Sequence, residues 1–305
     1  MLQPPPIVLS FAANDPSGGA GLQADLLTIA SMGCHPLSVM TAITVQDTAG
    51  VDDVMPLDPE WVADQARAVL EDMPVHAFKI GLLGSVEIIA AIAEVISDYP
   101  HIPLIMDPVL TSGRGDELAN EEMIDAMREL LLPQVTILTP NSLEARHLAQ
   151  RESDLSDIKL DLDLCAKRLL KMGCEYVLIT GTHENTAQVT NTLYGAQGIV
   201  RADEWERLEH TYHGSGCTLA SAIAASLAHG SSMNDSVIEA QDFTWHALQA
   251  GFRPGMAPTN VVMQAFGADG FKQEVVDELA RMVYPKALEQ ANINPYAPGS
   301  IEEYK

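Results

Sequence analysis

The chain has 305 residues, of which 47% are hydrophobic, so it is long enough to bury a substantial core. Acidic residues outnumber basic residues 42 to 17, and the formal net charge at pH 7 is −25. Such an acidic surface repels phosphate backbones and anionic lipids, which excludes nucleic-acid binding and membrane-surface binding as the main activity. An anionic ligand would have to be held by local groups such as helix N-termini, backbone amides or a metal ion.

Apolar strand-like segments alternate with helix-like segments through most of the chain. In chain order they are strand Ile7–Ala13, helix Ala20–Met32, strand Leu37–Val45, helix Pro59–Leu70, strand His76–Ile80, helix Glu87–Ile96, strand Pro103–Met106, helix Glu121–Leu132, strand Val135–Leu138, helix Leu160–Lys171, strands Tyr176–Ile179 and Gln188–Tyr194, and helices Cys217–Ala228 and Asp235–Gln249. This alternation predicts an α/β fold with a mostly parallel central sheet and helices on both faces. Without a repeat or a low-complexity linker, we predict a single domain over residues 1–305, with no clear element after about Pro254.

The sequence shows no sign of a targeting segment or a membrane span. Residues 1–6 lead directly into the first strand, and the longest apolar helical stretch, Cys217–Ala228, is too short to cross a bilayer. The four cysteines have no metal-binding spacing and suit a reducing compartment. We therefore expect a cytoplasmic protein.

Several unusual loops are expected at one edge of the sheet, where the parallel strands have their carboxyl ends. They are Asn14–Gly21, Gln46–Gly50, Gly81–Gly84, Asp107–Asp116, Thr139–Glu144, Gly181–His183 and His213–Cys217. Ligands of open parallel sheets bind beyond this edge, so the loops indicate a binding site there.

The segment His213–Thr218 is the strongest candidate for chemistry. Gly214 and Gly216 leave backbone amides accessible, and the following helix directs its unpaired N–H groups toward an anion. Cys217 falls in the first helical turn, where we expect the thiol pKa to be lowered so that the sulfur can accept a proton. A glycine-rich turn with a structural cysteine is an equally acceptable interpretation of this segment alone. It is neither a Walker A loop nor a dinucleotide-binding fingerprint.

Asn14–Gly21 and the segment from Thr139 to Glu144 carry further polar groups. Three glycines in the first segment permit close approach to a ligand, and Asp15 offers an acceptor; a helix N-cap is the alternative. Asn141 and Glu144, three positions apart on one helix face, offer an amide oxygen and a carboxylate, which suit Mg²⁺. A capping box of Asn141 with Glu144 is compatible with that role.

Lys79 and His183 each allow two interpretations. Lys79 ends a strand before Gly81 and would contact a phosphate or pair with a carboxylate. His183 would be a ligand or, more commonly, a solvated loop histidine. The histidines lack metal-ligand spacing, so no zinc site is assigned.

These residues, taken in order, resemble the ribokinase-like superfamily, and within it the hydroxymethylpyrimidine/phosphomethylpyrimidine kinases of thiamine biosynthesis. The resemblance extends from about residue 7 to 230. The matching segments are Asp15–Gly21 with Gln23–Asp25, Thr41-Ala42 with Gln46–Thr48, Lys79–Leu82, Asp107–Val109, Thr139–Asn141 with Glu144-Ala145, and His213–Leu219. The resemblance implies a three-layer ribokinase-like sandwich, ATP as co-substrate, Mg²⁺ and a homodimer.

The resemblance also implies a role for each matching position. Gln46 resembles the residue that hydrogen-bonds the amino-substituted edge of the pyrimidine, and Cys217 resembles the base. The anion hole would be Gly214, Ser215 and Gly216; the substrate pocket Ala13, Asp15, Gly21, Asp25, Leu82 and Val109; the nucleotide site Lys79, Asn141, Thr180, Gly181, His183 and His213; and the metal support Asp107 and Glu144.

The chain departs from the family pattern at several positions. It has Ala13, Asp47, Leu82 and Ser215 where the family usually has Gly, Asn, Met and Thr. Thr180 stands where the family has a lysine that would lie near the nucleotide phosphates. Because of Thr180, a catalytically silent pyrimidine-binding protein remains an alternative function. A pyridoxal-type vitamin kinase is a second alternative, since that group resembles this chain in its superfamily and in its glycine-rich anion hole. One phosphorylation or two successive ones are both compatible with the sequence.

Overall fold

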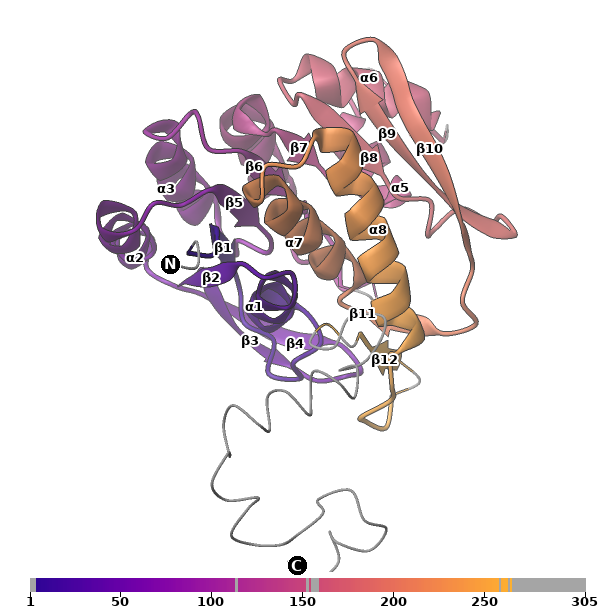
Figure 1. The fold of residues 1–305 in the computed structure, drawn as a ribbon, viewed down its shortest axis with the longest axis horizontal. Coiled ribbons are helices and arrows are strands. Elements are labelled where there is room, and N and C mark those ends of the chain that lie inside the picture. The colour runs from indigo at the N-terminus through magenta and orange to yellow at the C-terminus, as the bar shows by residue number, and fades with distance from the viewer. Residues whose placement is uncertain are drawn as a thin grey trace, which may run out of the picture.

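The computed structural model describes residues 4–112, 115–151, 154, 159–257, 259–262 and 264. Its centre is an eight-stranded sheet in the order β10-β9-β8-β7-β6-β5-β1-β2 (Figure 1). The strands are β1 (Ile7–Ala12), β2 (His35–Met40), β5 (Ala77–Ile80), β6 (Leu104–Met106), β7 (Ile137–Leu138), β8 (Tyr176–Ile179), β9 (Gln188–Gly195) and β10 (Gly198–Glu206). Strands β2 to β8 of this sheet pair in parallel, and only β9 and β10 pair antiparallel. The predicted α/β fold with a mostly parallel sheet is confirmed.

Helices cover both faces of the sheet because its strands are apolar on both sides. Side chains of β1 alternate between two core clusters, with Leu9 and Phe11 in one and Val8 in the other. One face carries α1 (Gly21–Ser31), α7 (Ser215–Ala228) and α8 (Met233–Gln249), which lie in front of the sheet in Figure 1. The other carries α2 (Pro59–Asp72), α3 (Val86–Ser97), α4 (Glu121–Ala126), α5 (Ser142–Ala149) and α6 (Leu162–Lys171).

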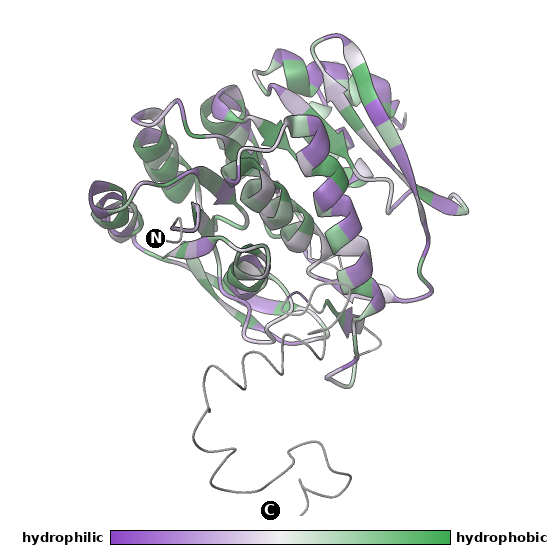
Figure 2. Ribbon diagram, in the orientation of Figure 1, coloured by the Kyte–Doolittle hydropathy of each residue, from purple (hydrophilic) through white to green (hydrophobic). Residues whose placement is uncertain are grey.

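Two helices on the same face of the sheet, α7 and α8, differ in polarity. Helix α7 is buried between the sheet and α8 and consists mainly of small and apolar residues, whereas α8 shows hydrophilic residues along its length in Figure 2. An element buried on all sides needs an apolar surface all round, and a covering helix needs only one apolar stripe. Within the described ranges, no helix is both long and apolar enough to cross a bilayer.

The single strand predicted over Leu37–Val45 is wrong, because the chain leaves the main sheet at Thr41. There the Thr41 N–H donates to Ala12 O at 3.1 Å and its hydroxyl donates to Leu82 O at 2.6 Å. The next residues form a separate hairpin of β3 (Ala42–Gln46) and β4 (Val51–Pro56). This exit directs Gln46 toward the carboxyl edge of the main sheet.

Other differences lie at helix ends and in short strands. The helix predicted over Glu121–Leu132 is α-helical only to Ala126; a π turn (Met127–Leu131) and a 3₁₀ turn (Leu132–Gln134) follow, since Pro133 cannot continue the backbone ladder. Strand β11 (Thr211–His213) pairs in parallel with β12 (Thr259–Val261). Most of the tail after Pro254, for which the sequence predicts no element, lies outside the described residues.

Candidate active site

The glycine-rich turn before α7 packs directly on the glycine-rich loop after β1. Gly214 has φ +94°, and a Cβ atom there would overlap the carbonyl oxygen of Gly19. A Cβ on Gly19 would in turn lie 2.7 Å from the His213 ring. Glycine is therefore required at position 214, whereas a side chain at position 19 would need the His213 ring to move. The two loops predicted to form the site do meet. The first turn of α7, at Ser215, Gly216 and Cys217, begins at this junction.

Cys217 is half-buried and lies among charged groups at the carboxyl edge. Burial raises the pKa of its thiol to about 12, and the carboxylates of Asp107 and Asp25 act in the same direction. The ammonium of Lys79 and a backbone hydrogen bond oppose this rise without overcoming it. The expectation of a lowered thiol pKa is therefore wrong for the ligand-free protein, because burial beside carboxylates outweighs the helix N-terminus.

Lys79 and Asp25 form an ion pair below Cys217. The Lys79 ammonium is 2.7 and 2.8 Å from the two carboxylate oxygens of Asp25, and both side chains are fully buried. Hydroxyls of Ser10 and Ser221 donate to the same carboxylate at 2.6 and 2.8 Å. A Cβ on Gly81 would lie 2.8 Å from the ammonium nitrogen, so Gly81 leaves room for it.

The pairing of Lys79 with a carboxylate is thus the correct one of its two interpretations. Direct contact of Lys79 with nucleotide, and of Asp25 with substrate, is not what the geometry supports, because neither side chain has exposed surface. Lys79 and Asp25 would instead act on the site indirectly, through the electrostatic effect of both side chains on Cys217.

Asp107 and Glu144 are two buried carboxyls at the carboxyl edge: Asp107 directly follows β6, and Glu144 lies in the first turn of α5, which follows the neighbouring strand β7. Asp107 is 5% exposed and Glu144 is 7% exposed. Burial raises the pKa of Asp107 to about 6, and burial together with the nearby Asp107 raises the pKa of Glu144 to about 8. A cation would relieve this cost, and Mg²⁺ is commonly held by one or two carboxylates plus phosphates and water. The donor set therefore fits Mg²⁺.

Two further facts refine this site. Among the described residues, no group of three His, Cys, Asp or Glu side chains could hold a metal, so oxygens from a ligand or water would have to complete the coordination. The predicted capping box is confirmed: Asn141 Oδ1 accepts from the Leu143 and Glu144 amides, and Glu144 Oε2 accepts from Asn141 N at 2.9 Å.

Gln46 lies beside His213 and above the loop after β1. Its side-chain nitrogen is 2.9 Å from His213 Nε2, which is itself 2.7 Å from Asp15 Oδ2. His213 was expected on the nucleotide side, but the structure places its ring with the expected substrate residues. The loop is joined to the neighbouring strands by backbone bonds, such as Ala13 N to Leu82 O at 3.1 Å. Val109 and Leu82 are partly exposed, whereas Ala13 is 1% exposed and Gly21 has φ +57°.

The residues expected at the nucleotide form a second group around the loop after β8. Thr180 forms a parallel bridge with Asn141, and its N–H donates to Pro140 O at 3.0 Å. Gly181 N donates to Asn191 Oδ1 at 3.2 Å, and His183 is exposed. The structure therefore brings Asn141, Thr180 and Gly181 together.

Sequence reasoning missed several residues that shape this edge. The guanidinium of Arg207 donates to the carbonyls of Thr182, Glu184 and Thr186 at 2.9 to 3.0 Å, so it holds the loop after β8. Gln264, 2% exposed, donates to Gly19 O at 2.9 Å. Neither residue lies in a motif, and no local sequence signal marks it.

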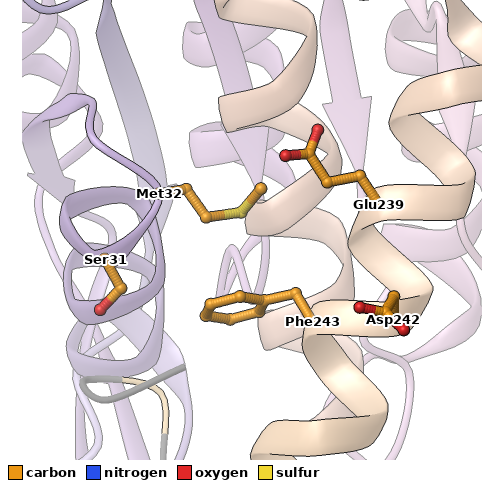
Figure 3. A pocket seen from close by; sticks show the side chains of 5 residues that line it. All are labelled: Ser31, Met32, Glu239, Asp242 and Phe243. Atoms are coloured by element: carbon orange, nitrogen blue, oxygen red, sulfur yellow. The ribbon is translucent and has the colours of Figure 1, made fainter. Parts of the chain in front are cut away.

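A cavity of about 280 Å³ between the end of α1 and α8 does not belong to this edge (Figure 3). Met32 and Phe243 point into it from the two helices, and the carboxylates of Glu239 and Asp242 flank it. It contains none of the predicted site residues, and its acidic lining would repel a phosphate. The edge with Gln46, Cys217 and Asp107 is the better candidate.

Comparison with known proteins places these features in context. The phosphomethylpyrimidine kinase family matches residues 15–262. A hydroxymethylpyrimidine/phosphomethylpyrimidine kinase of Streptomyces coelicolor is 38% identical over 256 residues, covering 82% of this chain and 91% of the relative. A second family, bacterial trigger factor protein, matches residues 241–305, most of which lie outside the described residues.

Two solved structures are close in fold. Pyridoxal kinase from Staphylococcus aureus, in complex with AMP-PCP and pyridoxal, has a TM-score of 0.74 and 29% identity, and the match covers 86% of this chain and 94% of that one. Phosphomethylpyrimidine kinase from Clostridium difficile has a TM-score of 0.68 and 33% identity, with 80% and 99% of the two chains covered. The ribokinase-like fold expected from the resemblance is confirmed.

Proposed function

The chain belongs to the phosphomethylpyrimidine kinase family, and from this membership we propose that it phosphorylates 4-amino-5-hydroxymethyl-2-methylpyrimidine, its monophosphate, or both, for thiamine biosynthesis. The chain is an ATP-dependent kinase: its relatives are named kinases, and a similar solved structure is a complex with AMP-PCP. The observation that supports this substrate most directly is the position of Gln46. Its carboxamide and the half-buried Cys217 lie at one sheet edge and are joined through the loop containing His213.

In this proposal the pyrimidine ring lies between Leu82 and Val109, and its polar edge pairs with Gln46. The hydroxymethyl oxygen then faces Cys217, and the γ-phosphate of ATP faces the N–H groups at the start of α7. Phosphoryl transfer needs little covalent work from a protein, so positioning and charge stabilisation supply most of the catalysis.

Charge that develops on the transferring group meets the N–H groups of Ser215, Gly216 and Cys217, whose helix dipole also favours it. Asp107 and Glu144 would hold Mg²⁺ together with the nucleotide phosphates; the bound ion neutralises phosphate charge. Asn141, Thr180 and Gly181 would contact the nucleotide from the loop after β8.

Cys217 is proposed as the acceptor of the alcohol proton. In the ligand-free protein the thiol keeps its own proton at neutral pH, because burial has raised its pKa. It must therefore lose that proton before it accepts one from the alcohol, and the carboxylate of Asp107, which is hydrogen-bonded to the thiol, is the adjacent group that would take it. The buried ammonium of Lys79 favours this ionisation, while the negative charges of Asp107 and Asp25 oppose it. A thiolate formed in such a setting is a strong base.

The test is mass spectrometry of the products formed with ATP, Mg²⁺ and hydroxymethylpyrimidine. We expect a monophosphate, and a diphosphate if both steps are catalysed. Cys217→Ala should lose nearly all phosphorylation while still binding the pyrimidine, and Cys34→Ala, at the opposite end of α1, serves as the control. Undiminished turnover by Cys217→Ala would remove this residue from the mechanism. A wild type that binds pyrimidine and forms no product would instead indicate a silent binding protein.

A second candidate function is phosphorylation of pyridoxal. It is favoured by the higher TM-score of the pyridoxal kinase structure, 0.74, over that of the phosphomethylpyrimidine kinase, 0.68. The same assay with pyridoxal in place of the pyrimidine separates the two, because the preferred alcohol has the larger kcat/KM.

A further inference from the structure

Three side chains from distant parts of the chain meet beside the expected substrate edge. Asp15 follows β1, Gln46 ends β3 and His213 ends β11. His213 Nε2 is 2.7 Å from Asp15 Oδ2 and 2.9 Å from the terminal nitrogen of Gln46. A single ring nitrogen thus faces both a carboxylate and a carboxamide.

Asp15 determines which role that ring nitrogen takes. The carboxylate is 1% exposed and accepts from Ser17 N at 2.8 Å and from Ala20 N at 2.7 Å. An ionised carboxylate has no hydrogen to donate. His213 Nε2 must therefore carry a hydrogen and donate it toward Asp15, and an atom of Gln46 next to that N–H should be an acceptor.

Thr44 imposes the matching condition on the other end of the carboxamide. Its Oγ lies 3.0 Å from the carbonyl oxygen of Asn14 and 3.3 Å from the terminal oxygen of Gln46. The hydroxyl has one hydrogen, and the Asn14 carbonyl can only accept it. Toward Gln46, the Thr44 oxygen is thus left as an acceptor, which calls for an N–H of the carboxamide.

Both conditions are met by a half-turn of the carboxamide, which exchanges two atoms of nearly equal size. We propose that Asp15, His213 and Thr44 hold Gln46 with its oxygen toward His213 and its nitrogen toward Thr44, and that His213 is thereby a positioning residue that determines substrate specificity. The inference rests on the proposed function, because it takes Gln46 as the partner of the ring edge.

The consequence is a fixed order of acceptor and donor offered to the substrate. The single Nε2 hydrogen of His213 is then shared between Asp15 and the Gln46 oxygen. With one lone pair of its oxygen facing His213 and one hydrogen of its nitrogen facing Thr44, Gln46 retains one acceptor site and one N–H for the substrate. A 4-aminopyrimidine presents an amino donor beside a ring-nitrogen acceptor. Its 4-oxo analogue presents an acceptor beside a ring N–H, which is the opposite order. Because the hydroxymethyl group must face Cys217, the analogue cannot bind in the reversed orientation that would restore the pairing. Gln46 would instead have to rotate its carboxamide and lose its contact with His213.

The test compares the wild type with His213→Leu for 4-amino-5-hydroxymethyl-2-methylpyrimidine and its 4-oxo analogue. Dissociation constants from calorimetry and kcat/KM values give the preference for the amino compound. We expect the wild type to prefer it by about 100-fold or more, since buried polar groups would otherwise be left unpaired. His213→Leu should reduce that preference at least about tenfold, because the carboxamide becomes free to rotate.

Two variants serve as controls. His213→Gln keeps an N–H within reach of Asp15 and should retain most of the preference. His210→Leu removes an exposed histidine of the same segment and should leave it unchanged. Full discrimination by His213→Leu would overturn the inference. If that variant does not fold, Thr44→Val, which keeps the shape and removes the hydroxyl, should narrow the preference in the same way.

Nuclear magnetic resonance of the Gln46 side-chain amide gives a readout that does not depend on substrate. Its two proton signals, assigned through their loss in Gln46→Ala, should be distinct from those of exposed glutamines and should move toward them in His213→Leu. Unchanged chemical shifts of the Gln46 amide protons in His213→Leu would overturn the inference. If the Gln46 amide signals move in His213→Leu but the wild type phosphorylates neither compound, the proposed function is contradicted. If the wild type is active and the signals do not move, only the role of His213 is contradicted.

Discussion

At the residue scale, the candidate site depends on polar groups that are buried only in part and are therefore available to a ligand. Gln46 combines a partly exposed position with two internal partners, which orient it before any ligand arrives. Orientation in advance reduces the entropy lost on binding, so such a residue contributes more than a freely rotating one.

Gln46→Leu should weaken pyrimidine binding by about 1–3 kcal/mol, because the polar edge of the ring would be buried without a partner. Calorimetry measures the affinity, and the fold is checked by thermal unfolding. Val45→Thr is a suitable control, since Val45 is 59% exposed on the adjacent position of the same strand. Equal affinity of Gln46→Leu and the wild type would show that the ring edge is read elsewhere.

The residue scale is also where sequence reasoning was least complete. The proximity of Gly214 and Gly19 could be expected, because both belong to glycine-rich loops at one edge. The ion pair of Lys79 with Asp25, 54 positions apart, could not be distinguished from a phosphate contact without the path of both chains. The predicted direction of the Cys217 pKa shift was wrong because the pKa depends on burial and on the carboxylates of Asp107 and Asp25, and no sequence motif gives their distances from the sulfur.

At the scale of the element, the loop between β8 and β9 is held mainly by side chains rather than by backbone pairing. Glu184 accepts from Arg146 at 2.7 Å and from Lys159 at 2.9 Å, and Arg207 binds three carbonyls of the loop. The expected nucleotide residues Thr180 and Gly181 begin this loop. Its shape therefore depends on charged groups that can be titrated.

Glu184→Gln should make the loop anchor insensitive to acid. The hydrogen bond from Arg146 lowers the pKa of Glu184 to about 2, so ionised Glu184 stabilises the fold above pH 4.5, and this contribution is lost as the pH falls toward 2. With the side chain 23% exposed, we expect the variant to be less stable by about 1 kcal/mol at pH 7.

Urea unfolding at pH 7, 5, 4 and 3 measures this difference. The gap between wild type and variant should narrow steadily below pH 5 and nearly close near pH 2. Glu60→Gln, on the exposed first turn of α2, is the control and should show no such pattern. A gap that is independent of pH would mean that the ion pair does not anchor the loop.

The elements themselves were predictable to different extents. Long apolar strands and helices such as β1, α1 and α3 lie within a few residues of their predicted bounds, because their periodicity and flanking glycines are local signals. The break at Thr41 was missed because both sides of it are equally apolar and only the Leu82 carbonyl marks the turn. Strand β12 was missed because three residues carry no periodicity, and its partner β11 is almost 50 residues away in sequence.

At the scale of the whole molecule, the net charge of −25 opposes the binding of a nucleotide. Local groups must overcome this field at short range, while at long range it slows the approach of ATP. The family membership and the acidic composition agree on a small-molecule kinase. The homodimer expected from the resemblance stays a prediction.

Added salt should therefore improve the capture of ATP. Raising KCl from about 20 to about 200 mM screens the repulsion, so we expect kcat/KM for MgATP to rise about twofold, with kcat nearly constant. Steady-state kinetics at fixed Mg²⁺ measure this, with the uncharged pyrimidine as the varied substrate for the control. A steep fall of kcat/KM for MgATP with added salt would show that attraction by local cationic side chains dominates the encounter.

The contact of Gln264 with Gly19 has a consequence for the timing of activity during synthesis. The loop that Gln264 braces is made within the first two dozen residues, yet the brace leaves the ribosome more than two hundred residues later. A nascent chain that ends before β12 would contain every sequence motif of the site. It would still lack the contact of Gln264 with Gly19 that supports the loop after β1. We therefore expect the nascent chain to become active only after β12 and Gln264 have been synthesised, and not gradually as the chain lengthens.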